Sequence, residues 1–241
     1  MPSKPAATRA AQRATQPAAK SPAADKALAN AIRKLRKMPS GFITDSMTRL
    51  GIGGWMDEVL PVQTKGRFVG PAVTLRWAPA RNAGTASMNI YEFIRTCRPG
   101  QVLVMETGVA DGWIMGENMA HHGQHQGLAA MVTDSNVRDY LEIAAMKIPV
   151  FSRGPAIRRA PVELVGLNVP VTCGGTQVAP GDLVVGDPDG IAVIPAARIA
   201  DVLYQAEDIA KLEAEQEKAI RAGVTMDQLN AIIAKKKILR K

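Results

Sequence analysis

The chain has 241 residues, of which 46% are hydrophobic, and a formal net charge of +8. This length allows one large domain or two small ones, and no uninterrupted apolar run reaches the roughly 20 residues that a membrane helix needs. The two cysteines, Cys97 and Cys173, are too few for a disulfide framework and lack CxxC spacing. They therefore favour reduced thiols and a cytoplasmic location.

The excess positive charge lies at the N-terminus. Residues 1–37 contain nine Lys and Arg against one acidic residue, whereas the rest of the chain contains 21 of each. Residues 1–24 hold almost no large apolar side chain, which predicts a disordered basic tail; a bacterial tail and an organellar transit peptide both stay open. The body lacks RNA-recognition and helix-turn-helix signatures, so we expect no specific nucleic-acid partner.

After the tail, residues 25–38 have the apolar spacing of a helix, and residues 39–222 form the predicted main domain. Within it, helices are predicted at 40–50, 86–95, 115–126, 139–146 and 197–222, and strands at 66–77, 101–105, 128–133, 149–152, 162–165 and 169–173. A hairpin with a turn at Asp189-Gly190 is predicted within 178–195. A final helix is expected within 223–241, at 226–239.

The predicted order mixes strand–helix units with hairpins. It therefore predicts an α/β fold, layered around a mixed sheet and flanked by terminal helices, rather than a regular Rossmann alternation. The glycines at 51–54 follow a helix and lack the spacing of a dinucleotide-binding loop, so we do not expect a nucleotide cofactor there.

The stretch 116–139 carries the strongest chemical signal. Its strand ends at residue 133 and delivers polar residues to the carboxyl end of the sheet, where open α/β sheets bind ligands. Arg138 can hold a carboxylate through two parallel hydrogen bonds, and Asp139 offers a hard oxygen ligand for magnesium or manganese. The pair indicates a site for a small oxo acid; the alternative is a helix N-cap beside a surface arginine.

Other candidates in this stretch have weaker signals. His121 and His125 have i, i+4 spacing and could share a metal. Gly123 between them weakens the helix, however, so we expect this helix face to lie toward solvent or a neighbouring subunit. Asp134 is expected to make a turn more readily than to bind metal. The methionines 115, 119 and 131 are expected in the core.

Four segments together resemble a known family: GENM at 116–119, VTDSNVRD at 132–139, VPVTCGG at 169–175 and PGDLVVGDPDGIAVIP at 180–195. They are similar to the regulator-of-ribonuclease-activity-A-like family, which includes the 4-hydroxy-4-methyl-2-oxoglutarate/4-carboxy-4-hydroxy-2-oxoadipate aldolases. The resemblance covers roughly residues 40–210. It implies a swivelling β/β/α fold assembled as a homotrimer or homohexamer, with active sites between subunits.

The resemblance also implies class II chemistry, in which Mg²⁺ or Mn²⁺ stabilises pyruvate enolate. Carried over by position, Gly116, Glu117, Asn118 and Met119 would line the substrate pocket, Arg138 would bind the substrate and Asp139 would hold the metal. Glu117 stands where the family often has Asp, and it would orient a metal-bound water as the general base. A neighbour's C-terminal acidic residue would complete the site, and Arg81 and Asn82 are further candidates for polar pocket atoms.

The expected reaction is therefore the cleavage of a small 4-hydroxy-2-oxo diacid to pyruvate and a second oxo acid, with oxaloacetate decarboxylation as a side activity. Two alternatives stay open: a non-catalytic protein-binding regulator of ribonuclease activity, and a lyase for a sugar-derived oxo acid. The family's purely regulatory members lack the metal-binding aspartate. The presence of Asp139 therefore favours an enzyme.

Overall fold

The computed structural model describes residues 21–63, 66–80, 89–108 and 110–240. Its helices are α1 (Pro22–Leu35), α2 (Ser40–Arg49), α3 (Ile90–Thr96), α4 (Glu117–His125), α5 (Tyr140–Ala144), η2 (Ala196–Arg198), α6 (Ile199–Arg221) and α7 (Met226–Lys235). Its strands are β1 (Leu60–Pro61), β2 (Phe68–Pro79), β3 (Val102–Glu106), β4 (Trp113–Met115), β5 (Ala130–Thr133), β6 (Asn136–Val137), β7 (Val150–Ser152), β8 (Val162–Leu167), β9 (Val171–Cys173), β10 (Thr176–Val178), β11 (Leu183–Asp187) and β12 (Gly190–Ile194).

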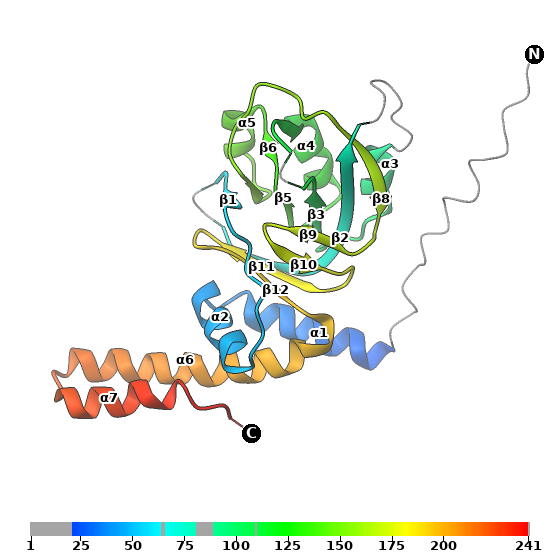
Figure 1. Ribbon diagram of the computed structural model, residues 1–241. Coiled ribbons are helices and arrows are strands. Elements are labelled where there is room, and N and C mark those ends of the chain that lie inside the picture. Colours follow the sequence, from blue (N-terminus) through cyan, green and yellow to red (C-terminus); the bar gives the residue numbers. More distant parts are fainter. Residues whose placement is uncertain (1–20, 64–65, 81–88, 109, 241) are drawn as a thin grey trace, which may run out of the picture.

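In the described residues, eight strands form one mixed sheet in the order β1-β7-β5-β3-β2-β11-β12, with β8 also paired to β2. The neighbours β7, β5, β3 and β2 run parallel, whereas β1, β8, β11 and β12 pair antiparallel. The parallel strands bring their carboxyl ends to one edge of the sheet. This edge lies on the side of the molecule that carries α4, α5 and the β4–β6 pair (Figure 1).

Three apolar layers give the fold its architecture. The first lies between the parallel strands and α3, α4 and α5. The second lies on the opposite face of the parallel strands, enclosed by the β9–β10 pair and by the β11–β12 end of the same sheet. The third packs the outer face of β11 and β12 on α1, α2 and α6 (Figure 1). In β11, Val184 faces the second layer while Leu183 and Val185 face the third, as the two-residue period of a strand requires. The predicted β/β/α layered fold with a mixed sheet is confirmed.

Several predicted boundaries were wrong. The final helix ends at Lys235 rather than at residue 239. Helix α1 begins at Pro22 rather than at residue 25, because Ser21 caps it through a 3.3 Å bond from the Ala24 amide and proline is favoured at the first helical position. The β11–β12 hairpin pairs Asp187 with Gly190. Its two loop residues are therefore 188 and 189, one position earlier than predicted. Of the predicted basic tail, residues 1–20 lie outside the described residues.

The C-terminal helices form an antiparallel hairpin beneath the third layer (Figure 1). Arg49, at the end of α2, ties this hairpin to the body: its guanidinium donates to Asp208 at 2.9 Å and to the carbonyls of Lys235 and Lys236 at the end of α7. Two acidic residues of α6 are paired as well: Glu207 bonds to a lysine of α1, and Glu213 bonds to a lysine of the segment after α7. Within the described ranges, no helix combines the length and apolar character needed to cross a membrane.

Candidate active site

A parallel pair of very short strands brings the two ends of the 116–139 stretch together. β4 and β6 pair through Met115 and Val137, and the Arg138 amide donates to the Met115 carbonyl at 3.0 Å. The residue that follows β4 is Gly116, which begins α4. Gly116 therefore lies beside Arg138 and Asp139, although the arginine comes 22 positions later in the chain.

Gly116 leaves no room for a side chain at this contact. A Cβ on this residue would lie 2.5 Å from Asp139 Oδ2 and 3.0 Å from Arg138 Nε. Such distances are far inside van der Waals contact. The site therefore requires glycine for close approach, not for its backbone angles, since its φ of −133° is open to any residue.

Asp139 adopts a left-handed backbone conformation, with φ 55° and ψ 45°. It occupies the N-cap position of α5, but its side chain makes no capping bond to that helix. Its Oδ2 instead accepts from the Glu117 amide at 3.1 Å, at the start of α4, and lies 3.4 Å from Arg138 Nε. The interpretation of Asp139 as a simple cap of its own helix was therefore wrong. A strained backbone of this kind is typical of functional sites.

Arg138 is half exposed, with 49% of its side chain accessible. Its guanidinium carbon lies over the Trp113 ring, 4.2 Å from the centroid, and its Nε faces Asp139. The described residues supply no hydrogen-bond partner for its two terminal nitrogens. These nitrogens are thus available to a carboxylate ligand.

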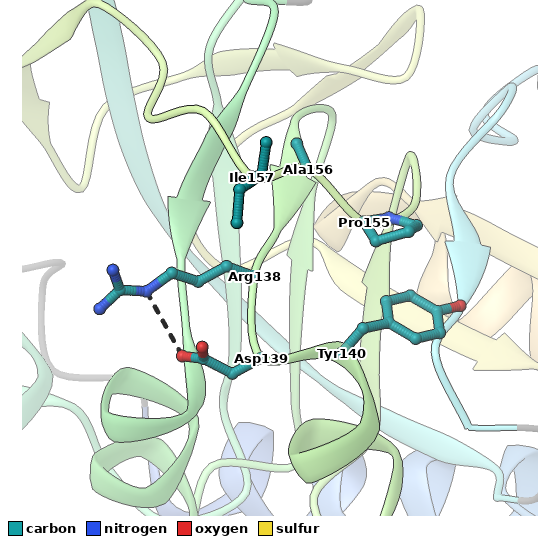
Figure 2. Close-up of a pocket in the computed structure, with 6 residues that line it drawn as sticks. All are labelled: Arg138, Asp139, Tyr140, Pro155, Ala156 and Ile157. Carbon is teal, nitrogen blue, oxygen red and sulfur yellow. Dashed lines mark ion pairs between the residues drawn. The ribbon is translucent and has the colours of Figure 1, made fainter.

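A hollow of about 470 Å³ runs along the stem of Arg138. It is lined by Arg138, Asp139, Tyr140, Pro155, Ala156 and Ile157 (Figure 2). In the same view the guanidinium and the Asp139 carboxylate point away from Tyr140 and Pro155. The charged ends of Arg138 and Asp139 therefore point away from this part of the lining. Ile157, at the rim, is 98% exposed.

A family model described as "RraA-like: Aldolase/RraA" matches residues 41–193, more than half of the chain. This protein belongs to the RraA-like family of aldolases and RraA proteins. The chain is 31% identical to a Halalkalibacterium halodurans protein named "Putative 4-hydroxy-4-methyl-2-oxoglutarate aldolase", over 80% of this chain and 90% of that one.

Two solved structures show the same RraA-like fold. Streptomyces coelicolor RraAS2, described as an unusual member of the RNase ES inhibitor RraA family, matches with TM-score 0.73 and 25% identity, over 78% of this chain and 97% of its own. An uncharacterised Pseudomonas syringae pv. tomato protein matches with TM-score 0.74 and 24% identity, over 84% of this chain and 97% of its own.

The other expected pocket residues of this RraA-like chain differ in their exposure. Glu117 is partly exposed and Asn118 is exposed, both in the first turn of α4. No other described group bonds to the Glu117 carboxylate, so it is free to act on a ligand. Met119 is only 8% exposed and packs, as expected, in the first apolar layer with Met115 and Met131. Its side chain therefore packs in the core under α4 and does not line a pocket.

The histidine candidates lie on the outside of α4. His121 and His125 are exposed, and His122 contacts the Tyr91 carbonyl at 3.1 Å. Asp134 is buried, and its Oδ1 accepts from both the amide and the hydroxyl of Thr107 at 2.7 and 2.9 Å. It joins the ends of β3 and β5. Arg81 and Asn82 lie outside the described residues.

Asp139 offers one oxygen to a cation. Its Oδ2 is engaged, whereas no described group bonds to Oδ1, and the side chain is 34% exposed. Across the described part of this chain, no cluster of three or more His, Cys, Asp or Glu could enclose a metal. A single open carboxylate oxygen fits Mg²⁺ or Mn²⁺, since Mg²⁺ is commonly held by one or two carboxylates and keeps several waters.

Sequence reasoning missed Trp113. It lies on a strand of three residues, too short for periodicity to indicate, and its indole N–H donates to the Ile157 carbonyl at 3.0 Å. The loop containing Ile157 also pairs with β4, through Arg158 and Ala160 on either side of Trp113. The one signal for a role of Trp113 at the site was its position, three residues before the glycine of the GENM segment.

Proposed function

We propose that the protein is a divalent-metal-dependent lyase that cleaves a small 4-hydroxy-2-oxo diacid to pyruvate and a second oxo acid. The observation that carries the proposal is the juxtaposition of Arg138 and Asp139, 3.4 Å apart at the start of α4. Among the described residues, the terminal guanidinium nitrogens of Arg138 and one carboxylate oxygen of Asp139 have no partner. Membership of a family that includes such aldolases supports the assignment.

The residues divide the chemistry between them. A divalent cation at Asp139 would supply Lewis-acid charge to the oxo oxygen of the substrate. Arg138 binds the substrate carboxylate through its two terminal nitrogens and adds positive charge where negative charge develops. The N-terminus of α4 contributes its dipole to the same region. The Glu117 amide donates to Asp139 Oδ2, and its carboxylate has no partner among the described residues. Glu117 would therefore orient the water that takes up the hydroxyl proton.

We further propose that the working form is a homotrimer or homohexamer in which a neighbour completes the site. The open hollow beside Arg138 and the apolar residues around it support this, since Ile157 is 98% and Leu141 79% exposed. Large apolar side chains exposed beside a charged site are typical of surfaces that another chain covers. Light scattering coupled to size-exclusion chromatography tests it, and a monomer at micromolar concentration would contradict it.

The reaction is tested by coupled detection of pyruvate from a panel of 4-hydroxy-2-oxo diacids and oxaloacetate. Each substrate is assayed with Mg²⁺, with Mn²⁺ and with excess EDTA. We expect pyruvate release that EDTA abolishes and either cation restores. The panel includes sugar-derived oxo acids, so the same experiment separates the two lyase alternatives. Failure of every substrate to give cation-dependent pyruvate would remove the lyase proposal.

A second candidate is a non-catalytic protein-binding regulator of ribonuclease activity. The likeness to RraAS2, whose description places it in an RNase ES inhibitor family, favours it, and so does Glu117 at a position that is often Asp in the aldolases. It predicts capture of an RNA-processing enzyme by the purified protein, unaffected by EDTA or by substitution of Asp139. A lyase predicts the opposite dependence.

A further inference from the structure

Two neighbours restrain the Arg138 guanidinium. Asp139 Oδ2 lies 3.4 Å from Nε, and the Trp113 ring lies beneath the guanidinium carbon at 4.2 Å from its centroid. A half-exposed arginine otherwise samples many rotamers. The two contacts engage Nε and one face of the guanidinium, and no described group bonds to its terminal nitrogens.

The indole of Trp113 is itself fixed. Its N–H donates to the Ile157 carbonyl at 3.0 Å, and its backbone pairs on both sides, from Trp113 N to Arg158 O at 2.8 Å and from Ala160 N to Trp113 O at 3.0 Å. Gly112 makes this pairing possible, because a Cβ there would lie 2.7 Å from both the Arg158 carbonyl oxygen and the Ala160 nitrogen. The ring is thus a rigid platform built by β4 and the loop opposite it.

We propose that Trp113 is a positioning residue for Arg138, which holds the guanidinium so that its terminal nitrogens meet a substrate carboxylate. This inference rests on the carboxylate-binding role proposed for Arg138. A cation over an aromatic face is attracted to it, and a group ordered before binding loses less freedom on binding. Trp113 touches the arginine and acts on the ligand only through it.

Oxalate with Mg²⁺ is a suitable probe, because it carries two carboxylates and undergoes no carbon–carbon cleavage of the aldol type. We expect Trp113→Leu to lower oxalate affinity, measured by calorimetry, by about two- to fivefold, the range of an exposed cation–π contact. Trp113→Phe keeps an aromatic face and stays within about twofold of wild type. In an Arg138→Lys background, Trp113→Leu changes oxalate affinity little, because the coupled partner is gone.

Trp55→Leu is the control, since Trp55 is a tryptophan that reaches the surface, 49% exposed, but lines a different hollow with Ser40 and Asp189. It should leave oxalate affinity unchanged. If Trp113→Leu binds oxalate like wild type, or weakens it equally in the Arg138→Lys background, the positioning role is overturned.

A ligand-free measurement separates this inference from the proposed function. In protein labelled with ¹⁵N-arginine, the Arg138 Nε–H signal should be displaced from the free-arginine position by the indole ring current. The displacement should persist in Trp113→Phe and vanish in Trp113→Leu. A wild-type signal at the free-arginine position would overturn the inference. A displaced signal in a protein that binds no oxalate would confirm the contact between Trp113 and Arg138 but contradict carboxylate binding by Arg138.

Discussion

The Cα of Gly116 faces the Asp139 carboxylate so closely that a methyl group would meet Oδ2 at 2.5 Å. We therefore expect Gly116→Ala to displace Asp139 and Arg138 together, to cost about 1–3 kcal/mol of stability from overpacking and to reduce turnover strongly. Pyruvate release and urea denaturation measure the two effects. Gly41→Ala is the control: it lies in α2 with open space around it, and it should stabilise the protein slightly. Full activity in Gly116→Ala would contradict the geometry.

The left-handed backbone of Asp139 makes asparagine the sharpest substitution there. Asparagine tolerates this conformation and keeps an acceptor for the Glu117 amide, but it removes the charge. Asp139→Asn should lose Mg²⁺-dependent turnover and metal affinity. Its melting temperature should change little, since the lost charge at the start of α4 contributes only about 0.3–1 kcal/mol. An Asp139→Asn protein with unchanged metal dependence would show that the carboxylate has no part in binding.

At the scale of elements, Asp208 fixes α6 to its neighbours. Burial on its own raises the pKa of its carboxyl, but hydrogen bonds from Arg49 and Arg240 outweigh this and lower that pKa below its ordinary value. A carboxyl with a depressed native pKa stabilises the fold above the unfolded pKa of about 3.9, and this contribution is lost as pH falls through the lower native value.

Asp208→Asn should therefore reduce the free energy of unfolding by about 1–3 kcal/mol at pH 7, because the side chain of Arg49 is only 3% exposed and loses a charged partner. The difference from wild type should shrink below about pH 4. Urea denaturation across pH 3 to 7 measures it. Glu217→Gln removes the exposed pair with Arg221 and should show neither effect. A pH-independent difference would mean that the Asp208 charge is not the cause.

At the scale of the whole molecule, the two cysteines report on different apolar layers. Cys97 lies in the first layer and Cys173 in the second, on opposite faces of the same sheet. Burial raises the pKa of Cys97 to about 11. Burial, followed by the nearby Asp134 charge, raises the pKa of Cys173 well above its ordinary value. Both thiols are therefore protonated and covered in the native protein.

We expect neither thiol to react with a disulfide reagent at pH 8, where a group of pKa 11 is about one part in a thousand thiolate. With rising urea, both should become reactive in a single transition, since the layers share β2, β3 and β5 and unfold cooperatively. Single-cysteine variants at 97 and 173 distinguish the two sites. Labelling of one thiol at much lower urea than the other would show that one layer opens independently.

The sequence by itself determined much of the fold. Local periodicity and turn chemistry predicted the long apolar strand at 66–77, the strands around 103 and 131 and the final hairpin. The structure contains all of them, with the long strand at 68–79. The chemistry of Arg138 and Asp139 made them candidate site residues, and the family resemblance added Gly116. The sequence alone predicts these features because each depends on residues close together in the chain, or on a continuous segment that resembles a family motif.

Only the tertiary structure decided how the site is built. The two-residue strand β6 and three-residue strand β4 have no periodicity of their own, and they exist because they pair with each other. That pairing places Gly116 against Asp139, turns the aspartate toward α4 rather than α5, and brings Trp113 under Arg138. These contacts join residues about 22 to 25 positions apart through backbone hydrogen bonds and close packing. Contacts between segments that are distant in the sequence stabilise this geometry. A local pattern of residue types therefore cannot predict it.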